Sequence, residues 1–481
     1  MANSKKNSKP KENLNTKEKK GLDISAKTFI VAIVVLFALM VVTYILTFII
    51  PGGQYAKTLD SAGNSVIDMT QGFQFVDGGI PFWKWILSPI LVLGANGNTT
   101  LISILAFLII IGGVFAWLDK TGFMRYMLDK IVYKFGDQKY KLMAIIMFFF
   151  MAMGSFIGSF EEVIPLVPII VALSLRFGWD KLTGLGMSLL AVGCGFATGV
   201  CNPFTVGVAQ TLAGLPMFSG MWYRAVAFVP IYFLVLFFVR YHAKKVEKPV
   251  LDQNNESEFQ DSKEMNSALK WFAIILIAGM ATIISSGVIT ALQPYNMIVV
   301  SLAFLIGGIV ASLIVHFKGK EMAKTFFDGA VSLLPAAILI LMAASIKYTM
   351  EEAKILDTVL YYAVDATSSM SRVTVLLFLY LIVLVMNFFI GSGSAKAFLL
   401  IPLMMPIAQI FNIPAQLCIM AFAFGDGFSN VFYPTNPVLL IGTGLANVSY
   451  GKWVKWTWKF QAMNLILTSG LLLLGLAIGY Q

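Results

Sequence analysis

Two halves of this chain carry the same succession of short motifs, and this internal repeat constrains the fold more than any other feature of the sequence. The matching segments are Phe156–Ser159 and Phe389–Ser392, Gly193–Phe196 and Gly425–Phe428, and Asn202–Pro203 and Asn436–Pro437. Each second copy follows its first by about 233 positions. Apolar helices interrupted by Gly, Pro and Ser at corresponding places in two halves are typical of secondary transporters.

The composition places the chain in a lipid bilayer. Hydrophobic residues make up 58% of it, whereas soluble domains contain about 45–50% apolar residues. Many apolar runs reach the roughly 20 residues that a helix needs to cross a bilayer. The net charge of +10 resides largely in short loops, where lysine and arginine orient the neighbouring helices. We therefore expect a membrane protein without a nucleic acid partner.

The apolar runs predict an all-α polytopic membrane protein. Spanning helices are expected at 29–50, 99–119, 222–240, 268–288, 296–316, 333–350 and 458–480. Segments 182–213 and 416–446 are each interrupted by an Asn-Pro pair and predict broken helices. Segments 142–176 and 373–409 predict re-entrant hairpins whose tips carry serine. The alternative for each hairpin is a pair of ordinary spanning helices joined by a turn at the surface.

The domain boundaries follow from these elements. They are a disordered basic tail over 1–28, a first repeat over 29–240, a cytoplasmic linker over 241–267, a connecting helix over 268–288 and a second repeat over 296–481. Amphipathic stretches near 121–135 and 352–366 precede the hairpins, and we expect them to lie along the membrane surface.

Lysine and arginine positions predict the orientation of these helices. With a cytoplasmic N-terminus, the loops predicted inside are basic, whereas the outside loop 51–82 and the stretch near 351–365 are mostly acidic, as the positive-inside rule requires. The first hairpin then opens from the cytoplasm and the second from outside. The single connecting helix inverts the second repeat, so the two repeats have opposite topology in the cell membrane and the C-terminus lies outside.

Four ionisable residues stand out because they lie in or beside the predicted breaks. Glu161 and Glu162 are at the first hairpin tip, Lys396 follows the second tip, and Asp426 lies in the second broken helix. A charge at mid-bilayer costs at least about 2.5–3.5 kcal/mol, so it is expected to have a partner or to line a cavity. One interpretation is a structural ion pair, for instance between Lys396 and Asp426. The other is the binding of a charged solute or coupling ion.

Polar residues around the breaks extend this candidate site. Backbone that is interrupted inside a membrane must line a cavity or bind something, because its amides and carbonyls lack helical partners. Half-helix N-termini after the tips would favour a carboxylate. The candidate substrate-binding residues are Ser159, Glu161, Glu162, Asn202, Ser392, Ser394, Lys396, Asp426 and Asn436. The candidate ion-coupling residues, whose oxygens suit Na⁺, are Thr205, Ser429, Asn430 and Thr435.

The two halves differ in charge, which bears on the substrate. Cys194 occupies the position of Asp426, and Glu161 corresponds to about Ser394. Three potential negative charges and one positive charge suit a solute with a cationic group better than a dianion. Lys396 would then hold the carboxylate of an amino acid.

At these tips and breaks the chain resembles the YfcC/DcuC-type anaerobic carriers of the ion transporter superfamily. The segments that carry the resemblance are 51–55, 161–165, 202–207, 387–394 and 424–430, within a likeness that covers about 29–480. The resemblance implies two hairpins, two broken helices, a homodimer and elevator-type alternating access. It also implies tips that hold a carboxylate and Na⁺, where Ser159, Glu161, Ser392 and Ser394 stand in this chain.

Members of that family include C4-dicarboxylate carriers and arginine/ornithine exchangers. Glu161 departs from a threonine of the relatives, and Lys396 stands where many have glutamine. These differences favour an amino acid such as arginine or ornithine, taken in exchange. A C4-dicarboxylate carrier coupled to Na⁺ or H⁺ is the alternative.

Two other classes of protein fit less well. An intramembrane aspartyl protease needs two aspartates that share a proton, and no second aspartate lies deep in another predicted helix, so we expect no enzymatic activity and no cofactor beyond coupling by Na⁺ or H⁺. A channel would share the polar breaks, but paired hairpins in inverted repeats favour alternating access.

The predicted topology can be tested with single cysteines and a membrane-impermeant thiol reagent. Cysteines introduced at positions 61 and 357 should react from outside, and a cysteine at position 255 should react only after the membrane is opened. The reverse pattern would contradict the inverted repeats.

Overall fold

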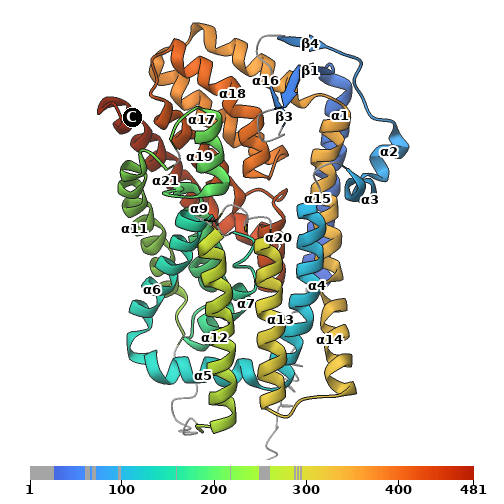
Figure 1. Cartoon of the computed structure of the whole chain (residues 1–481), viewed down its shortest axis with the longest axis vertical. Coiled ribbons are helices and arrows are strands. Elements are labelled where there is room, and N and C mark those ends of the chain that lie inside the picture. The colour runs from blue at the N-terminus through green and yellow to red at the C-terminus, as the bar shows by residue number, and fades with distance from the viewer. Residues whose placement is uncertain are drawn as a thin grey trace, which may run out of the picture.

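A computed structural model describes residues 26–59, 65–67, 72–95, 99–158, 160–216, 218–248, 260–286, 289, 292 and 295–480. Within these residues, nine helical stretches are long and apolar enough to cross a membrane. The chain is thus a predominantly helical, multi-pass membrane protein (Figure 1). Residues 1–25 of the expected tail and residues 249–259 of the expected linker lie outside the described residues. The remaining ends of these segments are largely helical, because α1 begins at Ala26, α11 continues to Val246 and α12 begins at Lys263.

The first half runs from α1 to α11. Its helices are α1 (Ala26–Ile49), α2 (Phe82–Ile86), α3 (Ser88–Leu91), α4 (Thr99–Lys120), α5 (Phe123–Phe135), α6 (Lys139–Ala152), α7 (Leu166–Arg176), α8 (Lys181–Leu185), α9 (Ala191–Thr198), α10 (Val208–Leu212) and α11 (Met221–Val246). Three π-helical segments adjoin them, η3 (Met153–Ile157), η4 (Gly186–Leu190) and η5 (Pro203–Gly207).

The second half runs from α12 to α21. Its helices are α12 (Lys263–Ser286), α13 (Asn296–Ile314), α14 (Lys320–Ser332), α15 (Leu334–Glu352), α16 (Leu356–Asp365), α17 (Arg372–Phe389), α18 (Gly393–Ile410), α19 (Ala415–Asn430), α20 (Pro437–Leu445) and α21 (Tyr450–Ala477). Helix pairs α6–α7 and α17–α18 occupy the predicted hairpins. The breaks after α9 and α19 fall at the two Asn-Pro pairs.

Several elements differ from the sequence prediction. Helix α14 lies between two predicted spans where the sequence analysis expected a loop, α12 begins five residues before the expected position 268, and α21 begins at Tyr450. The loop 51–82 forms four short strands, β1 (Gly53–Tyr55), β2 (Lys57–Leu59), β3 (Ser65–Ile67) and β4 (Phe73–Phe75), paired antiparallel as β1–β4 and β2–β3. Polar, amphipathic or very short segments of this kind carry a weak periodic signal.

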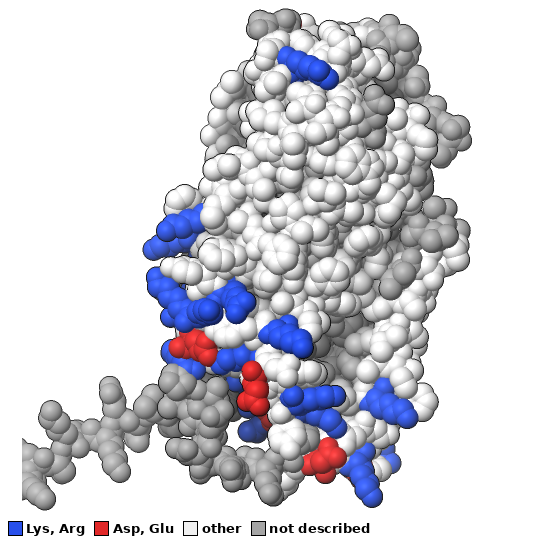
Figure 2. All heavy atoms as spheres, turned by 90° about the vertical axis from the view of Figure 1, so that its left-hand side faces the viewer, with Lys and Arg blue, Asp and Glu red and all other residues white. Residues whose placement is uncertain are grey.

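The two ends of the molecule have different elements and different charge. Figure 1 places α5 and α14 at one end, and β1, β4 and α16 at the other. On the face shown in Figure 2, lysine and arginine side chains gather towards the end that holds α5. The positive-inside rule then predicts that the end holding α5 and α14 is cytoplasmic and the end holding α16 is outside.

At the end opposite α5, the first half is tied to the second by the strand region. Thr358 donates to the Pro51 carbonyl at 2.8 Å, and the Tyr55 amide donates to an Asp357 carboxylate oxygen at 3.1 Å. Phe73 stacks on Tyr361 with ring centroids 4.3 Å apart. Asp357 is consequently buried, so position 357 is a poor site for thiol labelling, and exposed Tyr362 on the same helix is a better one.

At the end that holds α5, hydrogen bonds join α6 to α11. The Lys139 ammonium and the Tyr140 hydroxyl both donate to the Glu247 carboxylate. The hydrogen bond from Lys139 lowers the pKa of Glu247 below its ordinary value. His242 lies 3.2 Å from both carboxylate oxygens of Asp180, and Asp180 caps the N-terminus of α8 by accepting from the Thr183 amide. The first broken helix is therefore anchored at this end.

The broken helices cross in the centre through glycines. A Cβ atom on Gly195 would lie 1.9 Å from the Met151 carbonyl oxygen, and one on Gly427 would lie 2.2 Å from the Ala197 Cα atom. Gly193 and Gly425 are similarly close to Val431 and Val383. The repeated Gly-x-Gly motif thus lets helix backbones approach closely.

A methyl group at this crossing should therefore destabilise the protein. Gly427→Ala should lower the free energy of unfolding by about 1–3 kcal/mol, because the backbone of α9 has to move. Gly470→Ala is the matched control, since a Cβ atom there meets nothing within 4 Å and alanine favours the helix by up to about 1 kcal/mol. Thermal unfolding in detergent measures both, and equal melting temperatures for the two variants would contradict the packing role.

Candidate functional site

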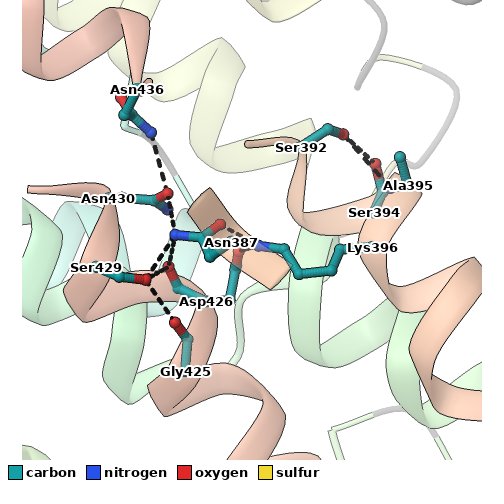
Figure 3. Close-up of polar contacts among 10 residues, drawn as sticks. All are labelled: Asn387, Ser392, Ser394, Ala395, Lys396, Gly425, Asp426, Ser429, Asn430 and Asn436. Atoms are coloured by element: carbon teal, nitrogen blue, oxygen red, sulfur yellow. Dashed lines mark hydrogen bonds and ion pairs between the residues drawn. The ribbon is translucent and has the colours of Figure 1, made fainter. Parts of the chain in front are cut away.

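A buried ion pair stands at the centre of the second half. The Lys396 ammonium, in the first turn of α18, donates to Oδ1 of Asp426 in α19 and also to the side-chain carbonyl of Asn387. Both charged side chains are 0% exposed. Figure 3 shows Lys396 reaching from the tip towards Asn387 and Asp426. The ion-pair interpretation of these two residues therefore describes their contacts in this conformation.

Asn387 connects this pair to the break of the second broken helix. Its amide nitrogen lies 3.0 Å from the Asp426 carbonyl, 2.6 Å from the Ser429 hydroxyl and 2.9 Å from Oδ1 of Asn430. Asn436, on the far side of the break, donates to the same Asn430 oxygen at 3.0 Å. Ser429, Asn430 and Asn436 thus belong to one network that fixes the break, as Figure 3 shows.

The two breaks are capped in the same way. Oδ1 of Asn202 accepts from the backbone amides of Phe204 at 2.9 Å and Thr205 at 3.3 Å. Oδ1 of Asn436 accepts from the two corresponding amides, those of Val438 and Leu439, at 2.9 and 3.3 Å. An asparagine N-cap before proline restarts each helix, because its side chain satisfies amides that have no helical partner.

Three buried polar atoms beside the first break have no hydrogen-bond partner among the described residues. They are Nδ2 of Asn202, Oγ1 of Thr205 and Oδ2 of Asp426. A Cβ atom on Gly393 would lie 2.6 Å from the Thr205 methyl and 2.9 Å from Oδ2 of Asp426, so these groups meet at the second tip. A Cβ atom on Gly158 of the first tip would lie 2.3 Å from Oδ1 of Asn202. The restart of the first broken helix therefore contacts both tips.

The first tip contributes the two glutamates. Glu162 is buried, and its carboxylate accepts from the Phe160 amide at 3.1 Å. Glu161 is partly exposed. Neither glutamate forms an ion pair with a lysine, arginine or histidine in the described part of the chain. Ser159 lies outside the described residues.

The remaining predicted residues are more peripheral. Ser392 caps α18 by accepting from the Ala395 amide at 3.4 Å, and its hydroxyl lies 3.5 Å from that of Ser394. Thr435 is partly exposed within the second break. A cavity of about 410 Å³ borders this tip through Ala395 and Phe398 and reaches Gly53 and Gln54 of strand β1. Three charged residues at and just after the end of α15 also line it, Lys347, Glu351 and Lys354.

The sequence analysis missed two functional candidates, Asn387 and Arg224. Asn387 ends an apolar helix and appeared there only within a family motif. Arg224, in α11, is 0% exposed and donates twice to the Val200 carbonyl, at 3.2 and 3.3 Å, in the first break. It also donates to Gln416 and to Tyr480. An arginine inside an apolar helix was the available signal, because such a residue needs buried partners.

Comparisons with known proteins show which family the chain belongs to. The profile of the "C4-dicarboxylate anaerobic carrier" family, DcuC, matches residues 29–477. The "Putative basic amino acid antiporter YfcC" of Escherichia coli K12 is 29% identical over 402 residues, which cover 79% of each chain. An uncharacterized protein of Haemophilus influenzae is 22% identical over 497 residues, covering 93% of this chain and 97% of the relative.

Two solved transporters overlap most of the chain at low similarity. The YdaH transporter of Alcanivorax borkumensis has a TM-score of 0.42 and 16% identity, with 95% of this chain and 99% of that chain covered. MtrF of Neisseria gonorrhoeae, from a class of antimetabolite efflux pumps, has a TM-score of 0.44 and 14% identity, with 92% and 94% covered.

The buried ion pair makes a prediction about stability. Asp426→Asn should destabilise the protein by about 3–5 kcal/mol, because it leaves the Lys396 ammonium buried without a counter-ion. Adding Lys396→Gln should recover most of that loss, since no charge then remains uncompensated. Thermal unfolding in detergent compares the single and double variants. A double variant no more stable than Asp426→Asn would mean that the two charges do not depend on each other.

Proposed function

The chain belongs to the C4-dicarboxylate anaerobic carrier family, and on that premise we propose that it is a secondary active transporter exchanging basic amino acids such as arginine and ornithine. The relevant observation is the charge around the two tips. Lys396 and Asp426 neutralise each other, which leaves Glu161 and Glu162 as acidic groups with no cationic partner among the described residues. Glu161 is also partly exposed, so its carboxylate is available to attract a cationic solute.

This charge balance disfavours a dianion. The Lys396 ammonium is enclosed by Asp426 and Asn387, so it is not free to pair with a second carboxylate. A dicarboxylate would also bring two negative charges close to Glu161. Like charges in a water-poor site repel strongly. The E. coli relative named as a basic amino acid antiporter supports the same substrate class.

We propose that transport proceeds by elevator-type alternating access in a homodimer. The two hairpin tips, Glu161–Glu162 and Ser392–Lys396, would close the site from opposite sides, as expected for inverted repeats. The network through Asn387, Asn430 and Asn436 joins the second tip to its broken helix. A unit held together in this way can move as a rigid body against α1, α4 and α12–α15. The N-terminus is proposed to be cytoplasmic and the C-terminus outside.

The C4-dicarboxylate alternative has one structural observation in its favour. Ser392 and Ser394 stand at the N-terminus of α18, an 18-residue helix, and helix N-termini attract carboxylates. Coupling to Na⁺ or H⁺ would then neutralise part of the substrate charge, with Thr205, Ser429, Asn430 and Thr435 as the candidate ion ligands.

Counterflow in proteoliposomes distinguishes the two substrates. Vesicles preloaded with ornithine should accumulate labelled arginine, whereas vesicles preloaded with succinate should not. Glu161→Gln should reduce arginine exchange at least about tenfold, because a hydrogen bond to a charged group contributes about 1.5–3 kcal/mol. Glu321→Gln is the matched control, because Glu321 of α14 forms only an exposed ion pair with Lys120 of α4. This variant should exchange arginine normally. Succinate exchange with arginine inert would establish the dicarboxylate alternative.

A further inference from the structure

The two breaks are capped alike but differ in one atom. In the second half, Nδ2 of Asn436 is occupied, because it donates to Asn430. In the first half, Nδ2 of Asn202 has no partner among the described residues, although Asn202 is 0% exposed. A buried donor left without a partner is unfavourable. An unpaired donor in only one of two otherwise matching caps indicates that a bound ligand accepts the hydrogen bond of Asn202 Nδ2.

We infer that Asn202, Thr205 and Asp426 form a cradle for the α-amino and α-carboxylate groups of the transported amino acid. The Asp426 Oδ2 atom would accept a hydrogen bond from the ammonium. Asn202 Nδ2 and the Thr205 hydroxyl would donate to the carboxylate. This assignment rests on the proposed function and specifies which part of the substrate this break recognises.

The orientation of the Asn202 amide is fixed by the backbone. Its Oδ1 atom accepts from two amides of η5, so the side chain cannot be flipped without placing a donor against donors. Nδ2 is therefore a buried hydrogen-bond donor without a partner among the described residues. A donor at this position cannot coordinate Na⁺, and it fits an anionic oxygen.

Asp426 supplies the complementary hydrogen-bond acceptor. One of its oxygens is paired with Lys396, and the other has no partner among the described residues. Gly393 gives that second oxygen room, because any side chain there would contact both Thr205 and Asp426. The cradle thus offers a carboxylate acceptor and two donors from buried side chains. The head group of an amino acid has the complementary groups, an ammonium that donates and a carboxylate that accepts.

The first tip would recognise the side-chain cation of the substrate. Gly158 of the first tip lies against Asn202, since a Cβ atom there would be 2.3 Å from Asn202 Oδ1. Glu161 follows on the same tip and is partly exposed, so we place it beside the cradle rather than within it. The head group and the side-chain cation would then be recognised by different residues. Removing one contact should change selectivity between analogues as well as affinity.

Three probes separate these contacts in the purified full-length protein. Ornithine carries both head groups, putrescine lacks the carboxylate, and 5-aminopentanoate lacks the α-amino group. Competition against labelled arginine should place both analogues at least about tenfold weaker than ornithine, since each loses a charge-assisted hydrogen bond. Binding of putrescine as tight as that of ornithine would overturn the cradle.

Two substitutions test the cradle without removing the cap. Asn202→Asp keeps the oxygen that caps η5 but replaces the free donor by an anionic oxygen. Ornithine should bind at least about tenfold weaker, while putrescine should bind as well or better. Thr205→Val should weaken ornithine alone, with an unchanged or higher melting temperature, because the hydroxyl has no partner within the described structure. Thr443→Val is the control, since that buried hydroxyl already donates to Leu439 at 2.7 Å.

The failures are distinguishable. If ornithine binds and exchanges but Asn202→Asp weakens ornithine and putrescine equally, the cradle is overturned and the proposed function stands. If the unmodified protein neither binds nor exchanges ornithine and arginine, the proposed function fails and the cradle fails with it. A selectivity shift towards putrescine in Asn202→Asp, absent from Thr443→Val, supports the cradle.

Discussion

The buried pair of Lys396 and Asp426 is the interaction on which the centre of the second half depends. Each charge alone would be costly when buried, and together they are tolerated because Asn387 satisfies further polar groups around them. The pair ties the tip of the second hairpin to the broken helix α19. Tip and helix are therefore held together, and the geometry of the neighbouring breaks follows from that attachment.

This attachment changes the interpretation of Lys396. From sequence, a lysine after a polar tip is a reasonable ligand for a substrate carboxylate. In the structure its donors face Asn387 and Asp426, so its charge is already used. The net charge of the site is then set by the glutamates of the first tip. The preference for a cationic solute, inferred from the charge count, therefore rests on fewer groups than the sequence suggested.

Much of the architecture could be predicted because membrane helices and their breaks leave strong signals. Long apolar runs located the spans, and the Asn-Pro pairs located both restarts, since an asparagine N-cap followed by proline has one favoured use. Helix α14 and the strands before α2 were missed, because amphipathic or three-residue elements depend on tertiary contacts. Side-chain partners were harder still. Nothing in the sequence indicates that Asn387, at the end of α17, connects Asp426 to Asn430.

The two repeats have matching backbone caps but different polar side chains, and this difference makes the candidate site asymmetric. Corresponding caps at Asn202 and Asn436 have matching hydrogen-bond distances, so the backbone positions are equivalent. Thr205, however, corresponds to Leu439, and Asp426 corresponds to Cys194. The free donor and hydroxyl come from the first break, and the carboxylate comes from the second half. The hydrogen-bond donors of the proposed cradle thus come from one half and its carboxylate from the other, an arrangement that suits a zwitterionic head group better than a symmetric dicarboxylate.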